Sequence, residues 1–293
     1  MSTSTPTGVI HDIGYRHYDG ERRGRSYIRR SLFVDSLKGA YGMGRSGRYK
    51  VLPMILFAVM CLPAGAIVAI TAVAGNSGLV GEYPTYVLNL QMVVLIFVAS
   101  QAPAAVSRDL RFGVMSIYLS RPLERVDYVV AKYIAMASAL AVLTAAPLTI
   151  MFVGALIVGL PLSEQVPDYL RAMGGAGLLS LILAGIGLAI AAFTPRRGLA
   201  VGAIIALLLV LAGVQAILQE LAVAEGFDGA PYLGLLSPFT LVQGVQSSLL
   251  GASSPLPEPS GVTGAVVFSA VALFVIAISF VALLLRYRRA SAS

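Results

Sequence analysis

The chain has 293 residues, of which 57% are hydrophobic and 12% charged, and its mean hydropathy is +0.84. These values lie outside the usual range of soluble domains, which excludes a soluble enzyme or a soluble binding module. The 21 Lys and Arg exceed the 14 Asp and Glu and give a net charge of +7, while the single cysteine excludes an intrachain disulfide or a cysteine metal cluster.

Residues 1–50 are expected to form a cytoplasmic N-terminal segment, because they lack the apolar region of a cleavable signal. Residues 1–24 are polar and rich in tyrosine. His11 and His17 lie six residues apart, a spacing that fits neither one face of a helix nor a zinc pattern. We therefore interpret this part as an ordered extension and not as a metal site.

Residues 26–43 are predicted to form an amphipathic helix, the interface helix, that Ser26 caps. Basic side chains lie beside an apolar stripe; they are Arg29, Arg30 and Lys38, and the stripe comprises Ile28, Leu32, Phe33, Leu37, Ala40 and Tyr41. A basic amphipathic helix directly before a span is expected to lie in the membrane interface with its apolar face in lipid.

Six long apolar stretches follow, and each supplies the ~20 residues that a helix needs to cross a hydrocarbon core about 30 Å thick. They run over 51–75, 86–107, 133–160, 172–193, 199–224 and 263–285. Continuous runs of this length favour helices over the alternating strands of a β-barrel. The sequence thus predicts an all-α polytopic membrane protein, with a six-helix transmembrane domain over 51–285 and a cytoplasmic tail over 286–293.

The charges between these stretches predict the orientation. Threading the chain through six spans places 20 of the 21 Lys and Arg on one side, with only Arg171 opposite. Basic loops stay in the cytoplasm, so both termini are expected there. The same asymmetry accounts for the basic pI as a topology signal that also attracts anionic lipids, which argues against nucleic acid as a partner.

The loop after the second stretch has the most distinctive sequence, SRDLRFGVMSIYLSRPLER over residues 107–125. Its first part is typical of a short amphipathic helix, with Leu110, Val114, Ile117 and Tyr118 on one side, and Pro122 ends it. Such a helix suits either a lipid surface or the groove of a soluble partner, and periodicity leaves both uses open.

The connection 225–262 is long and contains an apolar piece, residues 231–250, that is too interrupted to span. We interpret this piece as short re-entrant or interfacial helices, followed by a Pro-rich stretch over 253–261. Pro238 is predicted to begin one of these helices, because proline suits the first helical turn.

No residue pattern supports catalysis or cofactor binding by this chain. The span centres hold no charged residue. Asp127, Lys132 and Glu220 lie near enough to a span end to reach water or headgroups. No P-loop, Gly-x-Ser-x-Gly or His-Glu-x-x-His motif occurs. Uncharged Gln101, Gln215 and Gln219 either line a substrate path or form hydrogen bonds between helices. An interior with so few polar residues suits an amphiphilic or hydrophobic cargo.

Three loop segments and the N-terminus resemble an ABC-2-type transporter permease of actinobacterial type. They are SRDLR at 107–111, YLSRPL at 118–123, DYVVAK at 127–132 and IHDIGY at 10–15. The resemblance covers nearly the whole chain. It implies a type V exporter-like fold with a cytoplasmic coupling helix over 107–122 that docks into a separate ATPase.

The resemblance further implies how each segment works. The coupling helix would dock on the ATPase through polar contacts of Arg108, Asp109, Arg111 and Arg121. Leu110 and Tyr118 of the same helix would also belong to the docking surface. The interface helix would also touch the ATPase, and residues 231–250 would gate the exit. Two permease subunits, identical or paralogous, would act with two ATPase subunits that bind ATP and Mg. The resemblance implies export across a bacterial plasma membrane.

Two other classes of function remain to be compared with this one. A membrane anchor or assembly factor would use the same loop to recruit a cytosolic partner without transporting anything. A secondary carrier fits less well, because intramembrane charges and inverted repeats are missing.

Overall fold

A computed structural model describes residues 24–44, 46–75, 78–79, 81–111, 124–194, 196–254, 256–257 and 261–290. This part of the chain is all-helical, which confirms the predicted fold class. The helices are α1 Arg25–Ala40, α2 Arg48–Ala74, α3 Tyr83–Asn89, α4 Gln91–Arg111, α6 Arg125–Ile157, α7 Leu162–Phe193, α8 Arg197–Ala224, the 3₁₀ helix η1 Ala230–Leu236, α9 Pro238–Leu250 and α10 Gly261–Ala290.

Five of these helices, α2, α6, α7, α8 and α10, are long and apolar enough to cross a membrane. The second apolar stretch is a bent pair instead of one straight helix, because α3 and α4 meet at 58°. Leu90 lies between them; its N–H donates to the carbonyl of Tyr86, and its own carbonyl accepts from Val93 at 3.0 Å in a tight 3₁₀-type contact. If the pair is counted as one span, the described part of the chain has six candidate membrane spans.

Two helices begin well before the apolar stretches that predicted them. Helix α6 begins at Arg125 and not at 133, and α7 begins at Leu162 and not at 172. Their first turns contain the charged residues Asp127 and Glu164. These residues lower hydropathy without preventing a helix, so hydropathy marks the apolar part of a helix and not its ends.

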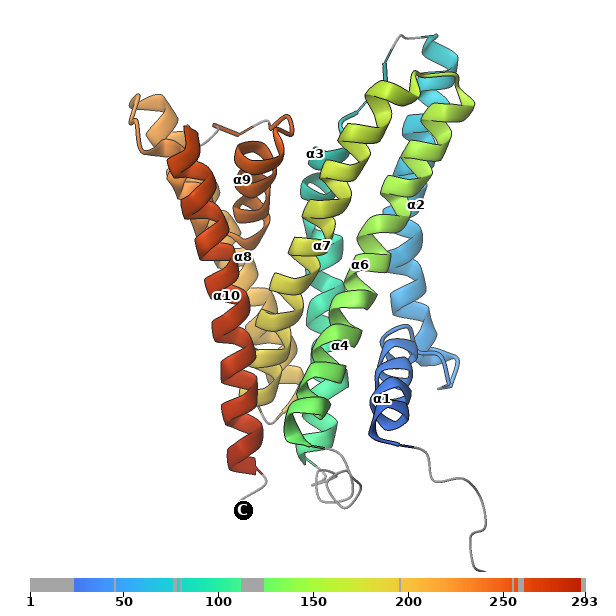
Figure 1. The fold of residues 1–293 in the computed structure, drawn as a ribbon, viewed down its shortest axis with the longest axis vertical. Helices are drawn as coiled ribbons and strands as arrows, with labels where there is room; N and C mark the ends of the chain where they lie inside the picture. Colours follow the sequence, from blue (N-terminus) through green and yellow to red (C-terminus); the bar gives the residue numbers. More distant parts are fainter. Residues whose placement is uncertain are drawn as a thin grey trace, which may run out of the picture.

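Helix α7 lies at the centre of the bundle. About 61% of its most apolar window is buried, against 17% for α8 and 22% for α2 and α10. It packs against α6, α4, α10 and α9, and in Figure 1 it stands between the α2–α6 pair and the α8–α10 group. Its approach to α4 depends on Gly187, where a Cβ would lie 2.6 Å from Val98 Cγ1.

Helix α1 lies where the interface helix was predicted, but two details differ from the prediction. Gly24 is its N-cap residue, so Ser26 is not the cap. Its apolar face packs on protein and not on lipid: Leu32, Ala40 and Tyr41 belong to the buried core. The Tyr41 hydroxyl donates to the Ala139 carbonyl of α6 at 2.7 Å. Helix α1 packs along α6, and this contact covers the apolar face of α1.

The turn between α1 and α2 requires a glycine at position 42. Gly42 has φ +69°, and a Cβ there would lie 2.4 Å from the Tyr49 carbonyl oxygen. Replacing Gly42 by Ala is expected to destabilise the protein by about 1–3 kcal/mol, because a left-handed backbone is costly for other residues. Thermal unfolding of the detergent-solubilised chain checks this. Gly47→Ala, at φ −52° with open space around its Cβ, is the control, and equal melting of both variants would contradict the prediction.

The connection between α8 and α10 confirms the predicted short helices. Helix η1 spans Ala230–Leu236, and α9 begins at Pro238, as the proline predicts. Almost every residue of α9 from Pro238 to Ser247 is buried. Helix α9 contacts α7 and α10 as well as η1, so it is packed within the bundle and is not a surface element.

Candidate functional site

The two ends of the bundle differ in charge. Helix α1, the starts of α2 and α6, the α7–α8 turn and the end of α10 lie at one end, here called the α1 end (Figure 1). The opposite, α3 end carries the α2–α3, α6–α7 and α8–η1 connections. Arg171 is the one basic residue there among the described ranges. The acidic residues at the α3 end are Glu82, Glu164, Asp168, Glu220, Glu225 and Asp228.

An ion-pair cluster at the α1 end joins α1 to the start of α6. It consists of Arg25, Arg29, Glu124 and Asp127, and we call it the Arg25 cluster. Arg25 Nε lies 2.6 Å from Asp127 Oδ2, and Arg25 Nη1 lies 2.6 Å from Glu124 Oε1. Arg29 Nη1 lies 3.6 Å from Asp127 Oδ1. One guanidinium therefore contacts two carboxylates that lie one helical turn apart.

Asp127 is the centre of this cluster. Its side chain is only 8% exposed, whereas those of Arg25 and Glu124 are 42% and 65% exposed. A carboxylate removed from water needs a cation or hydrogen-bond donors nearby, and Asp127 Oδ2 also accepts the Glu124 N–H at 3.3 Å. The hydrogen bond to Asp127 is the main cause that raises the pKa of Arg25 above its ordinary value, followed by the bond to Glu124.

The Asp127 carboxylate therefore contacts the guanidinium groups of Arg25 and Arg29 at the end of the bundle. Sequence reasoning missed Arg25 and Glu124. The Glu-x-x-Asp spacing of 124 and 127 before an apolar run is a helix-start signal, but no pattern in the sequence indicates that a residue about one hundred positions earlier pairs with it.

The predicted coupling helix lies partly outside the described residues. Arg108, Asp109, Leu110 and Arg111 form the last turns of α4, so this part continues the preceding helix without a break. Tyr118 and Arg121 lie outside the described ranges.

The helices on either side of this segment are joined at the α1 end. Lys132 Nζ of α6 donates to the Ala105 carbonyl of α4 at 3.1 Å. This contact lies close to the point where α4 leads into the predicted coupling segment. Of the predicted interface-helix contacts, Arg29 joins the Arg25 cluster, while Arg30 and Lys38 are exposed on α1.

The three glutamines proposed for a substrate path do not form one site. Gln101 Nε2 donates to the adjacent Ser100 Oγ at 3.2 Å. Gln215 Nε2 donates to Gln219 Oε1 at 3.2 Å, and Gln219 Nε2 donates to the Ala230 carbonyl at 2.9 Å. The Gln215–Gln219 pair thus attaches η1 to α8, which favours the hydrogen-bonding interpretation of these two residues.

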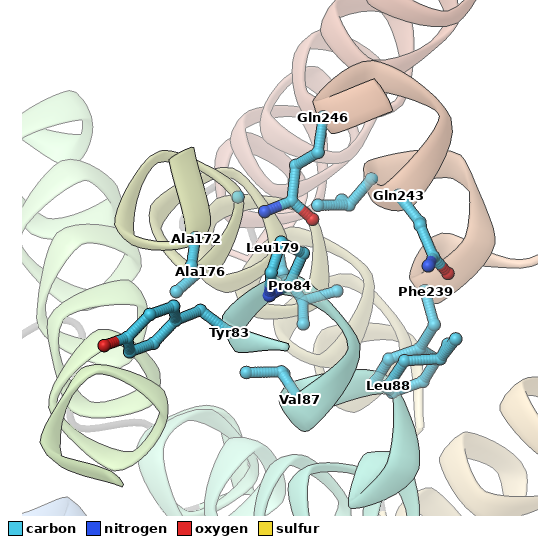
Figure 2. Close-up of a pocket in the computed structure, with 12 residues that line it drawn as sticks. Tyr83, Pro84, Val87, Leu88, Ala172, Ala176, Leu179, Phe239, Gln243 and Gln246 are labelled. Carbon is cyan, nitrogen blue, oxygen red and sulfur yellow. The ribbon is translucent and has the colours of Figure 1, made fainter. Parts of the chain in front are cut away.

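A cavity between α3, α7 and α9 contains polar residues that sequence reasoning missed. Figure 2 shows Tyr83 of α3, Leu179 of α7 and Gln243 and Gln246 of α9 around it. The Tyr83 hydroxyl donates to Gln165 Oε1 at 2.7 Å, and Gln246 Nε2 donates to the Arg171 carbonyl at 3.1 Å. The sequence pattern that could have indicated this cavity is the pair Gln243 and Gln246, three residues apart in the apolar piece 231–250.

These features define a class of protein: an all-helical membrane protein whose α1 end is basic and whose re-entrant-like helix packs inside the α3 end. Residues 88–291 match the family described as ABC-2 family transporter protein. The chain therefore belongs to this family and is a membrane-embedded transporter component, as the sequence resemblance indicated. Membership implies an ABC ATPase subunit as partner. A comparison with curated proteins gives no significant match.

Proposed function

We propose that this chain is the permease subunit of an ATP-driven exporter of an amphiphilic or hydrophobic substrate. It supplies the membrane path and the docking surface for two copies of a separate ATPase, which bind ATP and Mg. A second permease subunit, identical or paralogous, completes the transporter. The α1 end faces the cytoplasm of a bacterial cell, with the chain embedded in the plasma membrane.

The observation that carries this proposal is the connection of α1, α4 and α6 at the α1 end. The Arg25 cluster joins α1 to α6, and Lys132 joins α6 to α4. These contacts lie on both sides of the segment 107–122. A partner that pushes on this segment would therefore move three helices together, which is what mechanical coupling to an ATPase requires.

The chemistry of the bundle supports the cargo class and the orientation. The polar residues of the described spans that are buried away from the helix ends, such as Gln101, Thr144 and Ser180, are uncharged, which suits a substrate with a large apolar part. Basic residues collect at the α1 end, which favours a cytoplasmic location for that end.

The test is joint purification of the chain with its candidate ATPase in mild detergent, followed by ATP hydrolysis. A stable complex whose hydrolysis rate differs from that of the ATPase alone is the expected result. A complex with an unchanged rate would favour the anchor function, because recruitment would then occur without coupling. Absence of any complex would contradict the proposal.

A further inference from the structure

Gln243 is a buried polar side chain without a hydrogen-bond partner among the described residues. It lies on α9 and is 3% exposed, and neither its Oε1 nor its Nε2 forms a hydrogen bond within the described part of the chain. Buried polar groups nearly always have partners, because removal from water otherwise costs free energy that nothing recovers. Gln246, one turn further along, shows the usual behaviour, since it donates to the Arg171 carbonyl.

Two small cavities border Gln243 on different sides of α9. The first has a volume of about 20 Å³ and lies between α3, α7 and α9. The second has a volume of about 10 Å³ and lies towards η1 and α10, where Gln219, Thr240 and Phe268 also line it. In this measure one water-sized group needs about 10–15 Å³. In Figure 2 the Gln243 amide extends towards Phe239, away from Gln246.

The contacts of α9 make the first cavity the more open side. Towards α10 the helix is tightly packed, since a Cβ at Gly244 would lie 2.1 Å from Phe268 Cε1. Towards α3 and α7 the walls are mainly apolar side chains, among them Val87, Leu179 and Val242. The polar side chains that line this cavity are those of Tyr83, Gln243 and Gln246.

The residues that line the two cavities limit which chemical group can bind to Gln243. Among the residues that the structure describes, no carboxylate and no basic side chain lines either cavity, so an ion would be buried there without compensation. An amide offers an acceptor oxygen and donor N–H groups. A hydroxyl group both donates and accepts, is of water size, and so satisfies both ends of this amide.

We propose that Gln243 binds a hydroxyl group, supplied either by a water molecule or by a hydroxylated amphiphile whose apolar part lies along α3 and α7. The second source rests on the proposed transport function and would define the cargo as an alcohol or another hydroxyl-bearing lipid-like molecule. The first source does not depend on transport.

The sign of a stability change tests the binding of a hydroxyl. Met is close to Gln in length but cannot form these hydrogen bonds, so Gln243→Met loses the bound group. We expect the Tm of the full chain in detergent to fall by about 2–4 °C for each hydrogen bond lost. Gln246→Met, which loses a known bond, is the benchmark, and Gln243→Asn should fall between Gln243→Met and the native chain. An unchanged or higher Tm for Gln243→Met would overturn the proposal, because it would show an amide with no bound group.

A pair of matched additives distinguishes the two sources. Dodecanol and dodecane both partition into the micelle and differ only in the hydroxyl. If an amphiphile occupies the site, dodecanol raises the Tm of the native chain more than dodecane does, and Gln243→Met abolishes the difference. If water occupies it, the two additives act alike while Gln243→Met still melts lower. Neither measurement involves the ATPase, so its result is independent of the coupling experiment.

Discussion

Replacing Arg108 and Arg111 together by Glu is expected to weaken binding of the ATPase subunit by about 30-fold or more, while the permease remains folded. Both residues lie in the last turns of α4, where it leads into the predicted coupling segment. Loss of a charged contact within a protein interface costs about 2–5 kcal/mol, and reversal adds repulsion. Co-purification of the double variant with the ATPase, quantified against the native chain, is the measurement.

The matched control reverses the same amount of charge at the same end of the bundle. Arg196 directly precedes α8 and Arg197 is its first residue, and both are exposed. Glu at both positions changes the topology signal equally, so any fault in membrane insertion should affect both double variants. Native-level co-purification of the Arg108/Arg111 variant would contradict the assignment of this segment to ATPase docking.

Reversing the charge of Asp127 is expected to release α1 from α6 and to reduce ATPase stimulation by about fivefold or more, the range of ordinary coupling between sites. An Arg at this position would face Arg25 and Arg29, which both contact Asp127. The added positive charge lies at the basic end, so it agrees with the orientation signal and should not disturb insertion.

Spin labels report the release directly. Cys61, the one cysteine of the chain, can be replaced by Ser, and labels can then be placed at exposed Ser31 of α1 and Ile134 of α6. The distance distribution should broaden in Asp127→Arg and narrow again, in part, when Arg25→Glu is added. A distribution unchanged by Asp127→Arg would show that apolar packing alone holds α1.

The membrane-spanning architecture was predictable because long apolar runs follow from a simple physical requirement. A helix must cover the hydrocarbon core, and the five long helices and the bent pair each cover all or most of one predicted stretch. The break at Leu90 was not predictable, because a hydropathy profile does not report the direction of a helix axis. No proline or glycine marks the position either.

Side-chain partners were harder to predict because they join distant parts of the chain. The apolar stripe of α1 was recognised, but sequence alone could not distinguish lipid from the surface of α6 as its partner. Gln215 and Gln219 were predicted to line a path or to form hydrogen bonds, but the bond of Gln219 to η1 depends on how the chain returns after α8. Gln243 was missed because its significance lies in the absence of a partner among the described residues, which only a packed structure reveals.

The uneven charge of the two ends also has an electrical consequence. A bacterial membrane is negative inside, and moving one elementary charge across 100 mV costs about 2.3 kcal/mol. In the proposed orientation, with the basic α1 end inside and the acidic α3 end outside, each group of charges lies on the side that the membrane voltage favours. An inverted molecule would have both groups on the unfavourable side, so an energised membrane continuously reinforces the orientation that was set during insertion.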